Sequence, residues 1–259
     1  RITGMRITIL GCGSSSGVPA VGNYWGSCDP DEPRNRRLRS SVLIEVSGKR
    51  LLVDTSPDLR EQLLRVNHSH LDAVLFTHAH ADHVHGIDEL RWVNMATDRW
   101  LDVYSDQVTL DEIGQRFGYV FEEQFRDRPF YKPCLKAHRI EPGQFDVAGL
   151  TMTAFDQDHG YSRTLGFRIG NFAYSTDCVA LDDRAFDCLK GVDIWVVDCF
   201  RMDRHSTHSW FSLTLEWIER VRQGRAILTH MGPDMDYKTV AGLCPNGVEP
   251  AWDGMVIEI

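Results

Sequence analysis

The feature that most constrains this chain is the stretch THAHADH at residues 77–83, where three histidines and an aspartate lie within six residues. An apolar run of strand length precedes it, and Asp82 can cap a following helix, so we expect a strand-to-helix turn. His78 and His80 can then face one ion, while Asp82 and His83 turn toward a second. Neutral imidazole suits zinc, and carboxylate also suits manganese. The stretch therefore predicts two divalent metal ions, whereas a polar loop with surface histidines is the simpler alternative.

Two ions need about six or seven ligands, so further donors are expected at the ends of other apolar runs. Three residues meet this expectation. His159 follows the run that includes Phe155, Asp177 closes the run 173–176, and His230 closes the run 226–229. A sheet delivers the side chains at its strand ends to a shared rim, so these residues can join the histidine stretch.

These residues, in this order, resemble the metallo-β-lactamase superfamily, and Asp54 at the end of an apolar run resembles its first motif. The resemblance spans nearly the whole chain and implies an α/β fold, a four-layer αββα sandwich, as a single domain over 1–259. It also implies that His78, His80 and His159 hold one ion, that Asp82, His83 and His230 hold the other, and that Asp177 bridges them. Asp54 would orient the cluster without binding metal.

A narrower resemblance is carried by LGCGSSSGVP at 10–19, NRRLRSS at 35–41, and Asp198 leading to His208. These segments resemble the phosphoribosyl 1,2-cyclic phosphate phosphodiesterase branch of phosphonate catabolism and, more distantly, tRNase Z. That branch often has a cysteine cluster that holds a structural zinc. Here the segment 24–30 offers only Cys28, so we expect packing to stabilise this region and no third zinc.

The expected reaction is attack on phosphorus by a hydroxide that bridges the two metals, with Asp82 and Asp177 fixing the metals. The narrower resemblance makes His208 the acid for the leaving group and a substrate contact, and His205 is its competitor. Ser14 and Ser16 are candidate phosphate contacts. Their loop lacks the lysine of a nucleoside-triphosphatase phosphate loop, so its glycines are interpreted as close backbone packing.

The net charge of −9 argues against long nucleic acid as a partner, because such proteins usually carry a basic surplus. The basic run 34–39 is either solvated surface or a local aid to anion binding. We therefore expect a small phosphodiester or mononucleotide-like ligand. The nearest alternative is a tRNase Z-like RNA 3′-processing endonuclease, followed by a thioester or lactam hydrolase and a non-catalytic metal-binding protein. An oxygen-reducing diiron protein would typically carry glutamate in place of His80.

Further expectations concern the surroundings of the protein. No apolar run reaches the roughly 18 residues that span a bilayer, and no secretory signal pattern is present, so no membrane partner is expected. Seven cysteines without paired spacing fit reduced thiols and a cytoplasmic location. A homodimer is an expectation of the family resemblance.

Apolar patterning predicts the secondary structure. Strands are expected over 5–10, 42–46, 51–54, 73–76, 150–155, 165–169, 172–175, 194–198, 226–229 and 255–259. Helices are expected over 58–66, 83–95 and 210–222. The segment 117–142 is aromatic and charged without a clear period, and we interpret it as a flap or a partner-contact insertion.

Overall fold

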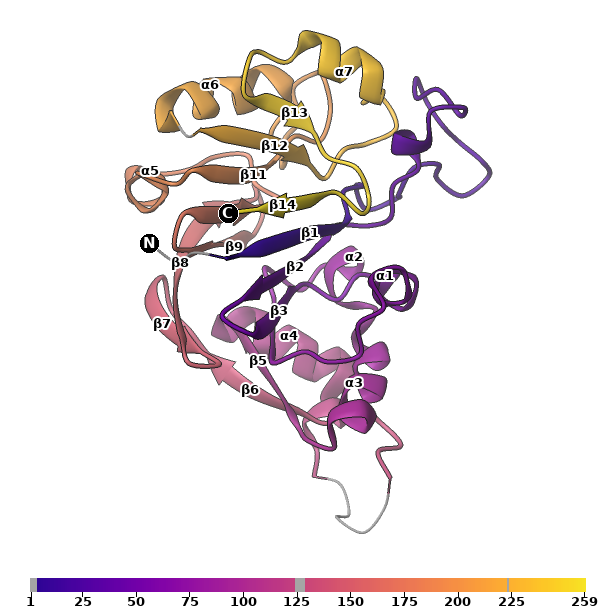
Figure 1. Ribbon diagram of the computed structural model, residues 1–259, viewed down its shortest axis with the longest axis vertical. Coiled ribbons are helices and arrows are strands. Elements are labelled where there is room, and N and C mark those ends of the chain that lie inside the picture. Colours follow the sequence, from indigo (N-terminus) through magenta and orange to yellow (C-terminus); the bar gives the residue numbers. More distant parts are fainter. Residues whose placement is uncertain (1–3, 124–128, 223) are drawn as a thin grey trace.

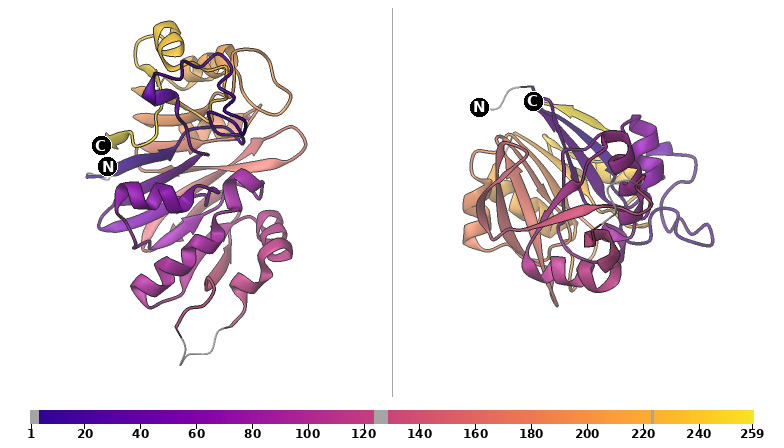
Figure 2. Two further views of the ribbon diagram at one scale, coloured as in Figure 1. Left: turned by 90° about the vertical axis from the view of Figure 1, so that its right-hand side faces the viewer. Right: turned by 90° about the horizontal axis from the view of Figure 1, so that it is seen from below.

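The structure, a computed structural model, describes residues 4–123, 129–222 and 224–259. Two seven-stranded sheets lie face to face, and helices cover the outer face of each sheet (Figures 1 and 2). This is the predicted four-layer αββα arrangement of an α/β protein.

The first sheet has the strand order β14-β1-β2-β3-β4-β5-β6. Strands β14, β1, β2 and β3 pair antiparallel, and β3 to β6 pair parallel. Its strands are β1 (Arg6–Gly11), β2 (Ser41–Val46), β3 (Lys49–Val53), β4 (Ala73–Leu75), β5 (Leu101–Ser105), β6 (Leu135–Arg139) and β14 (Val256–Glu258).

The second sheet repeats this plan with the order β13-β12-β11-β10-β9-β8-β7. Strands β7 to β10 pair antiparallel, and β10 to β13 pair parallel. Its strands are β7 (Gly143–Val147), β8 (Leu150–Asp158), β9 (Arg163–Ile169), β10 (Phe172–Ser175), β11 (Ile194–Asp198), β12 (Arg225–Thr229) and β13 (Val248–Pro250).

The helices of the two halves lie over different sheets, except that η1 of the first half contacts the start of α7 through Asn35. Those of the first half are η1 (Pro33–Asn35), α1 (Leu59–Val66), α2 (Ala81–Val84), η2 (Ile87–Glu89), α3 (Leu90–Thr97), α4 (Gln107–Phe117) and η3 (Gly118–Phe121). Those of the second half are α5 (Asp183–Leu189), α6 (Phe211–Val221) and α7 (Tyr237–Leu243). No helix among the described residues is both long and apolar enough to cross a membrane.

The alternation of side chains along each strand builds the layers. In β2, Val42 and Ile44 join the core that includes Phe167 of the second sheet, whereas Leu43 packs in a separate core with Leu59 of α1. Strands buried on both faces read as nearly continuous apolar runs, which explains why they could be recognised in the sequence.

Each predicted strand is present, with ends shifted by a few residues, but the predicted helix over 83–95 is wrong. The chain forms α2, then η2, then α3. The reason is that the carbonyl of His83 and the N–H of Gly86 form hydrogen bonds with the backbone of Thr55 and not within one helix. The His83 carbonyl accepts from the Thr55 N–H, and the Gly86 N–H donates to the Thr55 carbonyl. In addition, α2 begins before Asp82, which lies inside its first turn and does not cap it.

The segment 117–142 is not one insertion. It begins at the end of α4, passes through η3, and supplies strand β6, which pairs parallel with β5. Val120 and Leu135 are buried in the core under the helices. Residues 124–128 lie outside the described residues, so a flap or partner-contact role for that part stays a prediction.

Candidate metal centre

The predicted metal-binding residues converge at one rim, where strands of both sheets end. Asp54 follows β3, the histidine stretch follows β4, Asp177 lies just past β10, and His230 follows β12. Three of these residues have left-handed backbone, with φ of 63° at Asp54, 52° at Asp177 and 58° at His230. Such a conformation is costly for a residue with a side chain and clusters at functional sites. The chain turns sharply here to present donors at the rim.

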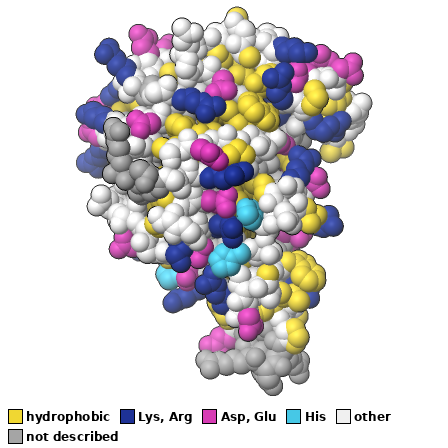
Figure 3. Space-filling view, in the orientation of Figure 1, with side chains coloured by type: hydrophobic (Ala, Val, Ile, Leu, Met, Phe, Trp, Pro, Cys, Tyr) yellow, Lys and Arg dark blue, Asp and Glu magenta, His cyan; other side chains and the backbone are white. Residues whose placement is uncertain are grey.

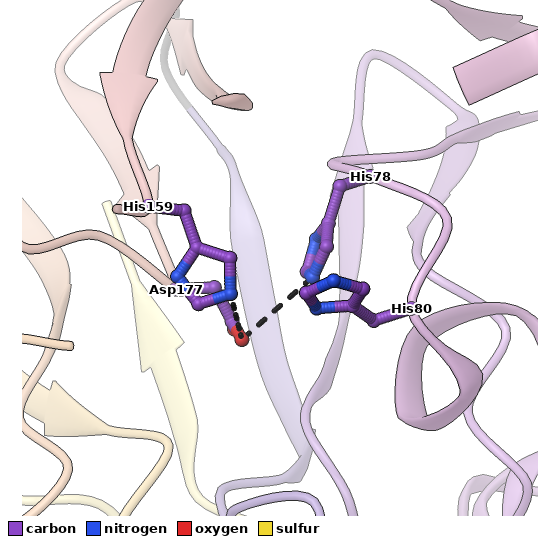
Figure 4. A group of neighbouring side chains, drawn as sticks. All are labelled: His78, His80, His159 and Asp177. Atoms are coloured by element: carbon purple, nitrogen blue, oxygen red, sulfur yellow. Dashed lines mark ion pairs between the residues drawn. The ribbon is translucent and has the colours of Figure 1, made fainter. Parts of the chain in front are cut away.

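The first group of donors consists of His78, His80, His159 and Asp177 (Figure 4), and its ligand atoms lie within 4.8 Å of one another. Oδ2 of Asp177 is 3.7 Å from Nε2 of His78 and 3.9 Å from Nε2 of His159. Three imidazoles from two strand ends thus face one carboxylate oxygen.

The second group consists of Asp82, His83, Asp177 and His230. Oδ1 of Asp177 is 3.1 Å from Nε2 of His83 and 3.3 Å from Nδ1 of His230. Oδ2 of Asp82 is 3.2 Å from Nε2 of His83. Asp177 therefore belongs to both groups and turns a different oxygen toward each. The structure brings together all seven residues that the sequence put forward as ligands.

Hydrogen bonds behind the donors fix the imidazole rings. Nδ1 of His83 is 2.7 Å from Oδ2 of Asp54, and that carboxylate also accepts from the backbone N–H and the hydroxyl of Thr77. Nδ1 of His78 lies 3.0 Å from the Thr77 hydroxyl, and Nδ1 of His159 donates to the carbonyl of Thr207. Partners of this kind on Nδ1 leave Nε2 available for a metal.

Charge and burial shape the protonation of the group. Burial lowers the pKa of His78, His159 and His230, which keeps these imidazoles neutral, the form that binds metal. Burial also disfavours a charged His83, but the carboxylates of Asp177, Asp82 and Asp54 outweigh it and raise the pKa of His83. Buried carboxylates at this rim therefore require positive charge between them.

Several polar atoms at the rim are buried without a hydrogen-bond partner. They include Nε2 of His78, Nε2 of His83 and Oδ2 of Asp82. An unpartnered buried polar atom is costly, and a cation that accepts these lone pairs removes the cost. The donor set and its orphaned atoms thus fit divalent metal ions.

His208 lies beside both groups, on the loop between β11 and α6. Its Nδ1 is 3.5 Å from Oδ2 of Asp198 and 3.9 Å from Oδ2 of Asp177. Burial disfavours its cation, but the neighbouring carboxylate of Asp198 leads the effects that raise its pKa to about 9. His205 is a half-exposed neighbour whose Nδ1 accepts from the backbone N–H of Thr207. The sequence motif contained Asp198, but its contact with His208 required the fold.

A cavity of about 390 Å³ opens over the donors. Its lining includes His208 and does not include His205. Of the serine loop, Ser15 lines the cavity, whereas Ser14 is buried and Ser16 donates to the Gly17 carbonyl. The sequence had put forward Ser14 and Ser16 instead. The lining also contains Tyr161, Ser162 and Thr207, none of which was predicted. Their closeness in sequence to His159 and His208 could have indicated that they line the site.

The loop that carries these serines is held by close backbone packing, as interpreted from its glycines. A Cβ on Gly13 would lie 2.8 Å from the Leu38 carbonyl.

The basic run 34–39 is not simply solvated surface, because Arg37 is buried and its guanidinium donates to the carbonyls of Gly232 and Met235. Nη1 of Arg37 also lies 3.8 Å from Sγ of Cys28. The buried arginine thus connects the segment that contains Cys28 to the loop after His230.

Comparison with known proteins decides the family. The family described as "Beta-lactamase superfamily domain" matches residues 49–231, which contain all seven predicted ligands. The chain belongs to this superfamily. Among solved structures, one that matches with a TM-score of 0.90 is that of "a New Diphosphatase from the PhnP Family". It shares 29% sequence identity, and the match covers 100% of this chain and 98% of that one.

Two curated relatives carry different names. "Octanoyltransferase" of Porphyromonas gingivalis is 34% identical over 256 residues, which is 97% of this chain but 51% of that relative. The chain thus spans about half the length of this relative. "Ribonuclease Z" of Mycobacterium sp. is 28% identical over 238 residues, or 78% of this chain and 80% of that protein. The chain is therefore similar to proteins with three different names, a diphosphatase, an octanoyltransferase and a ribonuclease.

Proposed function

We propose that this β-lactamase superfamily chain is a dinuclear metal-dependent phosphodiesterase that hydrolyses a small phosphodiester such as phosphoribosyl 1,2-cyclic phosphate. The observation that carries the proposal is the position of Asp177, which turns one oxygen toward each of two donor groups while His208 stands beside it. Similarity to a PhnP-family diphosphatase over the whole chain supports chemistry at phosphorus.

The two donor groups would each hold one ion, zinc or manganese, with Asp177 between them. When bound, a pair of divalent ions lowers the pKa of water and neutralises charge on phosphate oxygens. Asp177 would help to fix the spacing of the two ions and Asp82 would hold one of them, while Asp54 keeps His83 oriented through Nδ1. These residues supply a rigid site before the substrate arrives.

His208 would donate the proton that the leaving oxygen needs. Asp198 faces Nδ1 of its ring, which leaves Nε2 for the substrate. Its place in the cavity lining favours His208 over His205 as the acid. A positioned general acid of this kind contributes about 10²- to 10⁴-fold in rate.

Acyl transfer, named for the longer relative, is not part of the proposal. A thiol nucleophile must be accessible and ionised. Cys12, Cys178 and Cys199, the cysteines near the site loops, are fully buried, and burial raises the pKa of each thiol. They suit packing and not covalent catalysis.

An RNA 3′-processing endonuclease is the second candidate, because ribonuclease Z is a relative across most of the chain. The surface argues against long RNA. On the face shown in Figure 3, basic side chains alternate with acidic ones, and ion pairs such as Arg50–Glu45 and Arg6–Glu258 neutralise them. The lining of the cavity also contains no lysine or arginine among the described residues.

The deciding experiment is an assay of protein loaded separately with zinc and manganese against small cyclic and linear phosphodiesters and a tRNA precursor. Turnover of a small phosphodiester that is lost in Asp177→Ala and severely reduced in His208→Ala supports the proposal. Turnover of the tRNA precursor alone supports the endonuclease. Two bound metals without turnover of any substrate would indicate a non-catalytic metal-binding protein.

We also propose a cytoplasmic location and a homodimer. Among the described residues, six cysteines form no disulfide, which fits a reducing compartment: Cys12, Cys28, Cys178, Cys188, Cys199 and Cys244. Light scattering of the purified protein would give its mass, and a monomer at working concentration would contradict the dimer.

A further inference from the structure

Tyr161 has an unusual position at the mouth of the metal cavity. Its side chain is 94% exposed, the highest value for any aromatic residue among those described, yet it belongs to the cavity lining. Within the described part of the chain, its ring and hydroxyl have no hydrogen-bond or ring partner. No contact among the described residues therefore indicates that this aromatic side chain stabilises the fold.

The turn that carries Tyr161 is rigid. His159 N–H donates to Ser162 O and Tyr161 N–H donates to His159 O, which closes the turn between β8 and β9. Gly160 has φ of +79°, and a Cβ there would lie 2.8 Å from the Thr207 methyl group. The backbone is thus pressed against the loop of His208. An exposed ring on a fixed turn loses little entropy when a ligand covers it.

The rest of the lining defines what the ring can recognise. The lining consists otherwise of five of the seven candidate donors, His208 and three residues with hydroxyl groups, Ser15, Ser162 and Thr207. These groups suit phosphate and sugar oxygens, so among the described residues that line the cavity Tyr161 alone supplies a phenyl-type surface. Its place two residues from His159 puts that surface beside the phosphate position, at the mouth. A cavity of about 390 Å³ also falls in the range of small-ligand sites.

We infer that Tyr161 stacks on a planar base of the substrate, so that the favoured class is a base-bearing phosphodiester such as a nucleoside cyclic phosphate. This inference rests on the proposed phosphodiesterase function, and within it favours a base-bearing substrate over the base-free phosphoribosyl 1,2-cyclic phosphate. Aromatic side chains stack on bases of any identity, because every base has a π-face. Base identity should therefore matter little, whereas the presence of a base should matter strongly.

The test compares two substrates with the same cyclic phosphodiester, adenosine 2′,3′-cyclic monophosphate and methyl riboside 2,3-cyclic phosphate. Tyr161→Ala should raise KM for the nucleotide about 10-fold with little change in kcat. It should change kcat/KM for the base-free substrate at most about twofold. Tyr161→Phe should restore nucleotide KM, and Tyr131→Ala, which removes a 56% exposed tyrosine outside the cavity lining, is the matched control.

Equal losses on both substrates, or an unchanged KM for the nucleotide, would overturn the inference. Failure of the wild-type protein to turn over either substrate would count against the proposed function instead. The inference is then decided by calorimetric binding of adenosine monophosphate and ribose 5-phosphate to zinc-loaded protein. Binding of adenosine monophosphate that is about 10-fold weaker in Tyr161→Ala supports it, and unchanged binding refutes it.

Discussion

Oδ2 of Asp198 lies 3.5 Å from Nδ1 of His208, and Asp198 itself is fully buried. The same oxygen faces the backbone N–H groups of Cys178 and Ser209, so the carboxylate is held in place from two sides. Asp198 does not line the cavity and belongs to neither donor group. It faces the cavity residue His208, which makes it a positioning residue.

Asp198→Asn should lower kcat about 100-fold, because the amide neither holds the imidazolium nor fixes the ring as the carboxylate does. Metal content and thermal midpoint should stay close to those of the wild type. The measurement is steady-state kinetics on the best small phosphodiester, with metal analysis of the same samples. A variant that keeps full kcat would show that the Asp198 contact has no part in catalysis.

Asp177→Asn should reduce metal content from two ions per chain to one or none. Each of its oxygens faces a different donor group, and an amide supplies only one oxygen for both. Elemental analysis after dialysis against dilute zinc gives the stoichiometry. Asp187→Asn, which removes an exposed carboxylate from α5, should keep both ions. Two ions retained in Asp177→Asn would exclude Asp177 as the shared ligand.

Removal of metal should destabilise the fold. Without cations, the buried carboxylates of Asp54, Asp82 and Asp177 lie close to one another and to unpartnered imidazole nitrogens. Binding at about 1,000 times Kd contributes about 4 kcal/mol per ion, which corresponds to about 10 °C in a chain of this size. Calorimetry before and after chelation measures the shift. Equal midpoints for both forms would contradict metal binding at this buried rim.

The convergence of the seven candidate donors could be predicted, because metal ligands are drawn from a few residue types and these stand at strand ends. The buried strands were also predictable, since apolar runs such as 194–198 have few other uses. Strand β6 escaped detection because Lys136, His138 and Arg139 obscure its apolar positions. Asp198 and Tyr161 could not be assigned roles from the sequence. The contact of Asp198 with His208, ten residues further along the chain, and the exposure of Tyr161 at the cavity mouth exist only in the folded protein.

Arg37→Ala should destabilise the protein by about 3 kcal/mol. The side chain is 2% exposed, and its guanidinium satisfies the carbonyls of Gly232 and Met235 and the side-chain oxygen of Asn35. Alanine leaves these acceptors buried without donors and leaves a cavity. Urea unfolding measures the loss, and Arg36→Ala, at an exposed neighbour, is the control. Similar stability of both variants would show that the buried arginine does not hold this loop.

Asp253 should make the stability depend on pH. Burial raises the pKa of its carboxyl to about 6, although the backbone N–H groups of Leu38 and Cys12 donate to it and oppose the shift. An unfolded aspartate has a pKa of about 3.9, so between about pH 4 and pH 6 the folded protein binds more protons than the unfolded chain. Stability from this group therefore falls as pH rises through that window, by about 3 kcal/mol in total.

Asp253→Asn does not titrate at this position, so the free energy of unfolding of the variant should rise relative to that of the wild type by about 2.4 kcal/mol between pH 4 and pH 7.5. The comparison uses urea unfolding of both proteins at each pH. Other titrating groups, including the metal-binding residues, are common to both proteins and cancel in the difference. The amide loses one acceptor, which offsets the curve by a constant amount and leaves its slope unchanged. A difference that stays flat across this range would show that Asp253 keeps an ordinary pKa in the folded protein.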